Sequence, residues 1–152
     1  MKICLRTIAA LFGILSFAAG CGGTDFGDIG AITGNVTFQG EKIAPETKVI
    51  FMQMDKGYAG FGFTDDEGNY SIEWHREGTK FDGMPVGTYK VLVKPPGMID
   101  IEELSADEML DGADSKIAET KPAFDPKYTE TATSGIEFTI KAGENTCDIA
   151  LD

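Results

Sequence analysis

Few residues of this chain could carry out acid–base or nucleophilic chemistry. Among the 152 residues there is one histidine, His75, and three cysteines, Cys4, Cys21 and Cys147. A catalytic zinc site needs three protein ligands and a serine triad needs a histidine base, so either kind of active site would depend on His75 alone. The His-Arg-Glu sequence that begins at this residue lacks the second histidine that a peptidase zinc site requires. We therefore expect a protein that is not an enzyme and uses no cofactor.

Acidic side chains gather in one turn, where their oxygens could bind calcium. Asp65, Asp66, Glu67 and Asn69 lie within five consecutive residues. Calcium takes six to eight oxygen ligands, and an EF-hand loop closes with a glutamate that this turn lacks. Calcium binding by these four residues is therefore one hypothesis, and solvated turn residues are the alternative.

Aromatic side chains offer a second possible binding surface, because flat rings can stack on sugar rings. The candidates for carbohydrate binding are Tyr58, Phe61, Tyr70, Trp74 and Tyr128. Aromatic residues at alternate positions of a strand usually belong to the core, and Trp74 is in phase with Tyr70. The hypothesis requires that two or more of these rings lie coplanar in solvent.

The charge of the chain excludes one class of partner. The 25 acidic and 13 basic residues give a formal net charge of −12. This charge repels the phosphates of nucleic acids, so we expect no nucleic-acid partner.

The N-terminus has the pattern of an export signal. Lys2 and Arg6 precede an uncharged, mostly apolar run, residues 8–19. A run of this length is too short to cross a bilayer, which needs about 20 residues, but it suits a signal peptide. The sequence Ala18-Ala19-Gly20-Cys21 then resembles the lipobox of bacterial lipoproteins, with alanine where leucine is usual at position 18.

The lipobox resemblance implies a membrane anchor. Residues 1–20 would be removed as a signal peptide, Cys21 would carry the lipid, and residues 21–30 would form a flexible tether. Multiple acyl chains give stable membrane attachment. Gly22 stands where an aspartate retains lipoproteins at the inner membrane, so we expect a lipid-anchored envelope protein, with the outer membrane favoured over the inner.

Alternating apolar and polar residues predict seven short strands and therefore an all-β fold, a β-sandwich. The predicted strands are residues 32–38, 47–54, 58–64, 70–74, 89–93, 136–140 and 147–151. Strand 47–54 is apolar on both faces, which suggests a central position. We expect a hairpin loop at residues 64–69 with a positive φ at Gly68, a turn at residues 142–145, and a buried Cys147, although a reactive thiol is an alternative.

An acidic insertion interrupts this pattern. Residues 97–121 include seven acidic residues before position 115 and no basic residue in that part. Ser105-Ala106-Asp107-Glu108 has the arrangement of a capping box, which predicts a short helix at residues 106–110.

The order of these motifs carries a family resemblance. Gly34-Asn35-Val36-Thr37-Phe38, then Thr64-Asp65-Asp66-Glu67-Gly68-Asn69-Tyr70, then Pro85-Val86-Gly87-Thr88-Tyr89 resembles the carboxypeptidase regulatory-like domain. With the lipobox, the chain is similar to a group of uncharacterised lipoproteins of planctomycetes. The resemblance implies a seven-stranded, prealbumin-like (transthyretin-like) sandwich over residues 31–152, and it specifies fold rather than chemistry.

Three functional interpretations remain open. The first is a non-catalytic, lipid-anchored envelope module that contacts other envelope proteins or the surface layer. The second is a carbohydrate-binding module that contacts polysaccharide, and the third is a calcium-binding surface protein.

Overall fold

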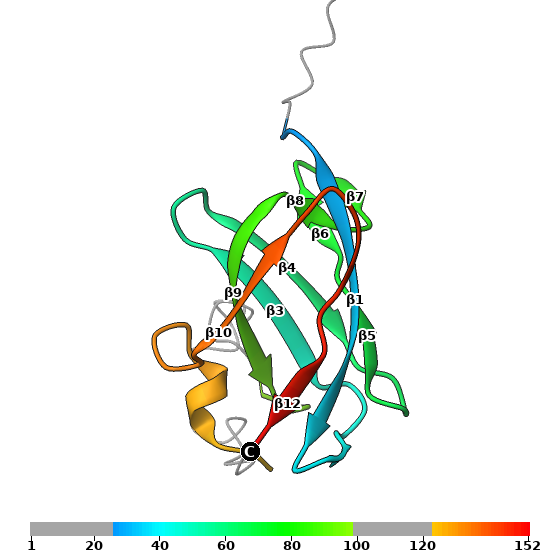
Figure 1. The fold of residues 1–152 in the computed structure, drawn as a ribbon, viewed down its shortest axis with the longest axis vertical. Coiled ribbons are helices and arrows are strands. Elements are labelled where there is room, and N and C mark those ends of the chain that lie inside the picture. Colours follow the sequence, from blue (N-terminus) through cyan, green and yellow to red (C-terminus); the bar gives the residue numbers. More distant parts are fainter. Residues whose placement is uncertain (1–25, 99–122) are drawn as a thin grey trace, which may run out of the picture.

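The computed structural model describes residues 26–98 and 123–152, which form twelve strands and a short 3-10 helix (Figure 1). The prediction of an all-β fold is confirmed. The elements are β1 (Ile29–Phe38), β2 (Glu41–Lys42), β3 (Lys48–Gln53), β4 (Tyr58–Phe63), β5 (Asn69–Ser71), β6 (Trp74–Arg76), β7 (Thr79–Phe81), β8 (Met84–Pro85), β9 (Gly87–Lys94), η3 (Pro126–Thr129), β10 (Ile136–Ile140), β11 (Gly143–Thr146) and β12 (Ile149–Leu151).

Strand β1 organises the first sheet. It pairs in parallel with β11 and β12 and antiparallel with β2, β5 and β8. Side chains alternate along it as predicted, so that Ile32 and Val36 are buried while Thr33 is exposed. One long strand thus holds several short segments from distant parts of the sequence in a common sheet (Figure 1).

The second sheet is antiparallel, in the order β10-β9-β3-β4. The central position predicted for residues 47–54 is confirmed, because β3 lies between β9 and β4. Val49 and Phe51 of β3 belong to the core, together with Tyr89 and Val91 of β9. A third, two-stranded sheet joins β6 to β7.

Apolar side chains from both larger sheets meet in one core. The cluster joins Ile32 and Val36 of β1 to Val49 and Phe51 of β3, and Trp74 is its largest fully buried side chain. Each fully buried Val, Ile or Phe contributes about 1.5–3 kcal/mol relative to exposure. The burial of one face of each sheet against the other is therefore the main source of stability.

The turn predicted at residues 64–69 joins strands of two different sheets, and most of the turn predicted at residues 142–145 is a strand. Residues 64–69 do not close a hairpin within one sheet, because β4 pairs with β3 whereas β5 pairs with β1. The turn itself is present, because the Asp65 N–H donates to the Asn69 carbonyl at 2.9 Å and Phe61 forms an antiparallel bridge with Glu73. Residues 143–146 form strand β11 rather than a turn, since their backbone pairs in parallel with β1 from Gly30 to Thr33.

The folded part begins earlier than residue 31. Strand β1 starts at Ile29, and the ring of Phe26 packs edge-on against Trp74 with a centroid distance of 4.9 Å. The predicted tether, residues 21–30, therefore overlaps the folded domain from Phe26 onward. The signal peptide, Cys21 and nearly all of the acidic insertion at 97–121 lie outside the described residues.

Candidate functional site

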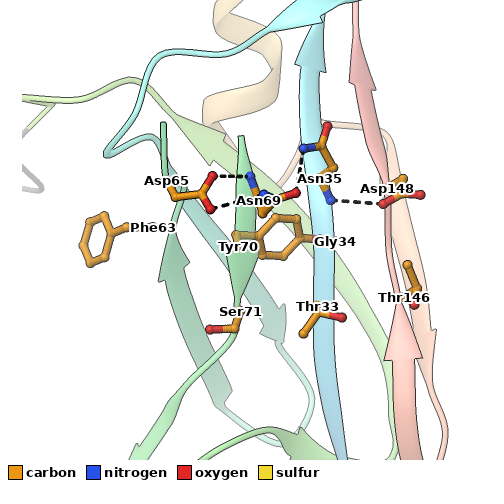
Figure 2. Close-up of a pocket in the computed structure, with 10 residues that line it drawn as sticks. All are labelled: Thr33, Gly34, Asn35, Phe63, Asp65, Asn69, Tyr70, Ser71, Thr146 and Asp148. Carbon is orange, nitrogen blue, oxygen red and sulfur yellow. Dashed lines mark hydrogen bonds between the residues drawn. The ribbon is translucent and has the colours of Figure 1, made fainter. Parts of the chain in front are cut away.

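A shallow groove of about 570 Å³ lies on the outer face of the β1 sheet (Figure 2). Polar side chains from three strands and two loops supply most of its lining. The lining residues are Thr33, Gly34, Asn35, Phe63, Asp65, Asn69, Tyr70, Ser71, Thr146 and Asp148.

Strand register brings the polar residues together. Thr33 on β1 lies opposite Ser71 on β5, and Asn35 lies opposite Asn69. On the parallel partner, Thr146 lies beside Thr33. Because successive side chains of a strand point to opposite faces, the residues between these positions enter the core and the polar residues gather outside.

The amide and carboxylate groups of the groove are held by hydrogen bonds. Asp65 Oδ1 accepts from the backbone N–H groups of Glu67 and Asn69, each at 2.8 Å. The Asn69 side chain donates to Asp65 Oδ2 at 3.2 Å and accepts from Asn35 Nδ2 at 3.1 Å. These bonds fix the Asn35 and Asn69 amides before any ligand arrives.

Two carboxylates make the groove acidic. Hydrogen bonds from Asn69 and Glu67 lower the pKa of Asp65 below its usual value, so this group is negative at neutral pH. Asp148 Oδ1 accepts from the backbone N–H of Asn35 at 3.0 Å. The arrangement offers acceptors and hydroxyl groups, which suits ligands rich in hydroxyl or cationic groups and disfavours anions.

The floor of the groove is formed by Tyr70 packed against Gly34 (Figure 2). The Tyr70 hydroxyl donates to the Cys147 carbonyl at 2.6 Å, and burial raises the pKa of this phenol well above its usual value. A Cβ built on Gly34 would lie 1.9 Å from the Cys147 carbonyl oxygen. Glycine at position 34 is therefore required for the close approach of β1 to the segment before β12.

The aromatic residues predicted to bind sugar are not gathered on the surface. Trp74, Tyr70 and Tyr128 are buried members of the core, so stacking of a sugar on Trp74 or Tyr128 is excluded. Tyr58 is half-buried against Trp74. Phe61 is exposed, and its ring stacks on His75 with centroids 6.1 Å apart and an angle of 10°.

Phe63 lines the groove, although it is not among the aromatic residues predicted to bind sugar. Its side chain is 53% exposed. The sequence does contain a pattern that predicts this exposure, because Gly60 and Gly62 alternate with Phe61 and Phe63. A Cβ on Gly62 would lie 1.9 Å from the Ser71 carbonyl oxygen, so the inward face of β4 must be bare and its phenylalanines face out.

The proposed calcium ligands serve the loop instead. Both carboxylate oxygens of Asp65 accept hydrogen bonds from within the loop. Within residues 26–98 and 123–152, no group of three or more His, Cys, Asp or Glu side chains is arranged to hold a metal ion. Asp66 and Glu67 are exposed turn residues, in agreement with the alternative interpretation.

The two other residues that could react, His75 and Cys147, do not line the groove. Cys147 is free and buried, as predicted, and burial raises the pKa of its thiol. His75 is the middle residue of β6, and its Nε2 lies 3.6 Å from a carboxylate oxygen of Glu73. Glu73 also pairs with Lys80 at 2.6 Å.

The comparisons with known proteins assign no family to this chain. No family model and no curated protein matches the sequence. Among solved structures, the chain is similar to the Bacillus anthracis TIE protein, with a TM-score of 0.42 and 9% identity over 82% of this chain. The match spans only 16% of the length of that protein. None of the helices in the described part of the chain is long and apolar enough to cross a membrane.

Proposed function

We propose that this chain is a non-catalytic binding module, anchored by lipid at Cys21 to the bacterial envelope, with the outer membrane favoured. The observation that carries the binding role is the groove, in which polar groups from several strands are held in place beside the exposed ring of Phe63. The lipobox-like sequence Ala18-Ala19-Gly20-Cys21 supports the anchor.

The geometry of the domain is compatible with such an anchor. The first described residues enter at one end of the long axis, and the C-terminus lies towards the opposite end (Figure 1). A lipid on Cys21 would hold the Phe26 end near the membrane. The distal part of the β1 sheet would then face away from the bilayer.

We also propose the prealbumin-like, carboxypeptidase regulatory-like fold for this domain. Its support is the agreement of β1, β3, β4, β9 and β10 with five of the seven predicted strands. The short strands β2, β6, β7, β8 and β11 would then be additions to the seven-stranded framework.

The partner of the groove is proposed to be an envelope protein, and polysaccharide is the second candidate. Hydroxyl groups of Thr33, Ser71 and Thr146 beside a partly exposed ring favour a sugar, because sugar recognition combines hydrogen bonds with stacking. In this second case Phe63, rather than Trp74, would stack on the sugar ring. The depth of the groove is small, which suits an extended chain or a protein surface rather than an enclosed small molecule.

The test is site-specific photo-cross-linking in intact cells that produce the full-length protein. A photoreactive amino acid replaces Thr146 in the groove, and the matched control carries it at Thr139, an exposed threonine on β10. We expect one dominant adduct that forms from position 146 and not from position 139. Its protein or glycan content distinguishes the two candidate partners.

Equal labelling from both positions, or no adduct from position 146, would contradict a binding role for the groove. A Phe63→Ala variant with the photoreactive group at 146 separates the candidates further. Loss of a glycan adduct is expected if the ring stacks on sugar.

A further inference from the structure

A second cavity, of about 250 Å³, lies where strands β3 and β9 separate. Pairing between the two strands ends at Met52 and Lys90. The residues that follow Met52 and those that precede Lys90 line the cavity instead, namely Gln53, Met54, Thr88 and Tyr89. The cavity is therefore an opening in the second sheet, and it shares no lining residue with the groove on the β1 sheet.

The main chain of Thr88 faces this opening. The Phe61 N–H donates to the Glu73 carbonyl at 3.0 Å and the Phe61 carbonyl accepts from the Glu73 N–H at 2.9 Å, so the main chain of Phe61 points away from β3. Because main-chain groups alternate between the two edges of a strand, Ile50, which lies opposite Phe61, points its own groups at Leu92 of β9. Four residues before Leu92, the same alternation turns Thr88 towards β3, which supplies no partner there. Thr88 thus offers one main-chain donor and one main-chain acceptor to a ligand.

Gln53 contributes a buried amide to the wall of the cavity. This residue is 9% exposed, and its Oε1 has no hydrogen-bond partner among the described residues. Gly87 leaves room for the amide, because a Cβ at that position would lie 2.8 Å from Gln53 Nε2. Buried polar side chains are nearly always hydrogen-bonded, and an unpaired one destabilises the fold. A ligand that bonds to the Gln53 amide would remove this cost.

Side chains of opposite charge flank the opening. Lys90 of β9 lies directly opposite Glu137 of β10, and both line the cavity. Within residues 26–98 and 123–152, no ion pair joins these two side chains. Asp55, in the turn after β3, adds a second carboxylate. A ligand that carries both charges would therefore find a partner for each.

The remaining side chains give the cavity an apolar side. Met52 and Met54 both line it, and Met54 is 70% exposed. Methionine is flexible and polarizable, so it adapts to the shape of an apolar group. Tyr89 adds only its ring, because its hydroxyl donates to the Pro85 carbonyl at 2.8 Å.

We propose that this cavity binds a free α-amino acid with an apolar side chain. The Lys90 ammonium and the Thr88 N–H bind its carboxylate, and its side chain packs against the two methionines. Glu137 and Gln53 Oε1 accept from its ammonium group, since the last torsion of glutamine is soft and lets the amide turn towards the cavity. Pockets for drug-sized ligands have about 300–1,000 Å³, so the volume of this cavity suits a smaller molecule. The inference does not depend on the proposed function, because the groove involves none of these residues.

Calorimetric titration of the purified full-length protein with L-leucine is the first test. N-acetyl-L-leucine and L-leucine amide are the matched probes, because each lacks one of the two charges of the amino acid. We expect L-leucine to bind and each blocked form to bind about tenfold more weakly or less, since each loses a charge-assisted hydrogen bond. No binding of L-leucine at millimolar concentration, or equal binding of the three compounds, would overturn the proposal.

A charge variant tests the placement of the carboxylate. Lys90→Gln should weaken the binding of L-leucine by about tenfold or more, because it removes the cationic partner. Lys141→Gln, which changes an exposed lysine outside the cavity, is the matched control and should keep the wild-type affinity. Equal affinities in the two variants would contradict the placement.

A variant of the buried amide supplies a readout of stability as well as of binding. Gln53→Met keeps the length of the side chain and removes its polar atoms. It should raise the urea midpoint of the ligand-free protein and abolish the further rise that L-leucine produces in the wild type. A lower midpoint would show that the fold itself satisfies the amide, and wild-type affinity in the folded variant would show that the ligand does not contact it; either result contradicts the proposal.

Discussion

At the scale of single residues, Asp65 joins the candidate site to the fold. Its carboxylate accepts hydrogen bonds from two backbone N–H groups and from the Asn69 amide, and these bonds lower its pKa. A carboxyl group whose pKa is lower in the folded state stabilises that state above its unfolded pKa. This contribution is lost as the pH falls through the folded-state pKa.

The usual pKa of this group is 3.8. When the pH is lowered below this value, we therefore expect the wild type to lose more free energy of unfolding than Asp65→Asn does. Urea titrations of both proteins between pH 2 and 7 give the comparison. Asp66→Asn, which changes an exposed residue of the same loop, is the control and should follow the wild type. Parallel curves for wild type and Asp65→Asn would contradict the assigned role.

Gly68 is a second residue on which this loop depends. Its φ is +82°, which confirms the predicted positive φ. A Cβ at this position would lie 2.8 Å from the Val36 carbonyl oxygen. Gly68→Val should therefore lower the free energy of unfolding by more than about 1 kcal/mol. Gly57 has a φ of +66° with nothing within 4 Å of its Cβ position, so Gly57→Val isolates the cost of the backbone conformation. Equal losses in the two variants would show that the contact with β1 carries no cost.

At the scale of elements, strand β4 shows how a glycine pattern sets which face is buried. Its inward positions, Gly60 and Gly62, approach Glu73 and Ser71 so closely that a side chain would clash. Gly62→Ala should destabilise the fold by about 1–3 kcal/mol, the usual cost of overpacking. Chemical denaturation measures the change, and an unchanged midpoint would contradict the close approach of β4 to Ser71.

The local pattern located most strands but not their partners. Alternation was enough to find β1, β9 and β10, whose apolar residues recur at every second position, and β3 was found as a short run that is apolar on both faces. It failed at Gly143–Thr146, whose polar sequence is typical of a turn and which is a strand only because β1 supplies hydrogen-bond partners. It also failed to show that the chain changes sheet after residue 64, since the alternation of Tyr70 and Ile72 fits either sheet.

The groove could be predicted only in part for the same reason. Asp65 and Asn69 were predicted as possible calcium ligands, although they form hydrogen bonds with each other within the loop. Thr33, Ser71 and Thr146 are ordinary outward-facing positions until the register of β1 brings them side by side. Polar residues on a solvent-facing strand carry no signal of this convergence.

At the scale of the whole molecule, the negative charge bears on the calcium hypothesis. Calcium could bind weakly to many exposed carboxylates, whereas a specific site would stabilise the folded state by mass action. Because the Asp65 oxygens are engaged within the loop, we expect the melting temperature to be the same in millimolar calcium and in chelator. A rise of several degrees in calcium that is abolished by Asp66→Asn would contradict this expectation.

The proposal on which the function rests most is that a lipid on Cys21 holds the domain at the envelope. Intact-mass spectrometry of the full-length protein purified from the membrane fraction tests it most directly. We expect a chain that begins at Cys21, lacks residues 1–20 and carries the added mass of a diacylglyceryl group and further acylation. A mature chain with an unmodified Cys21, or one cleaved elsewhere and recovered without lipid, would contradict it.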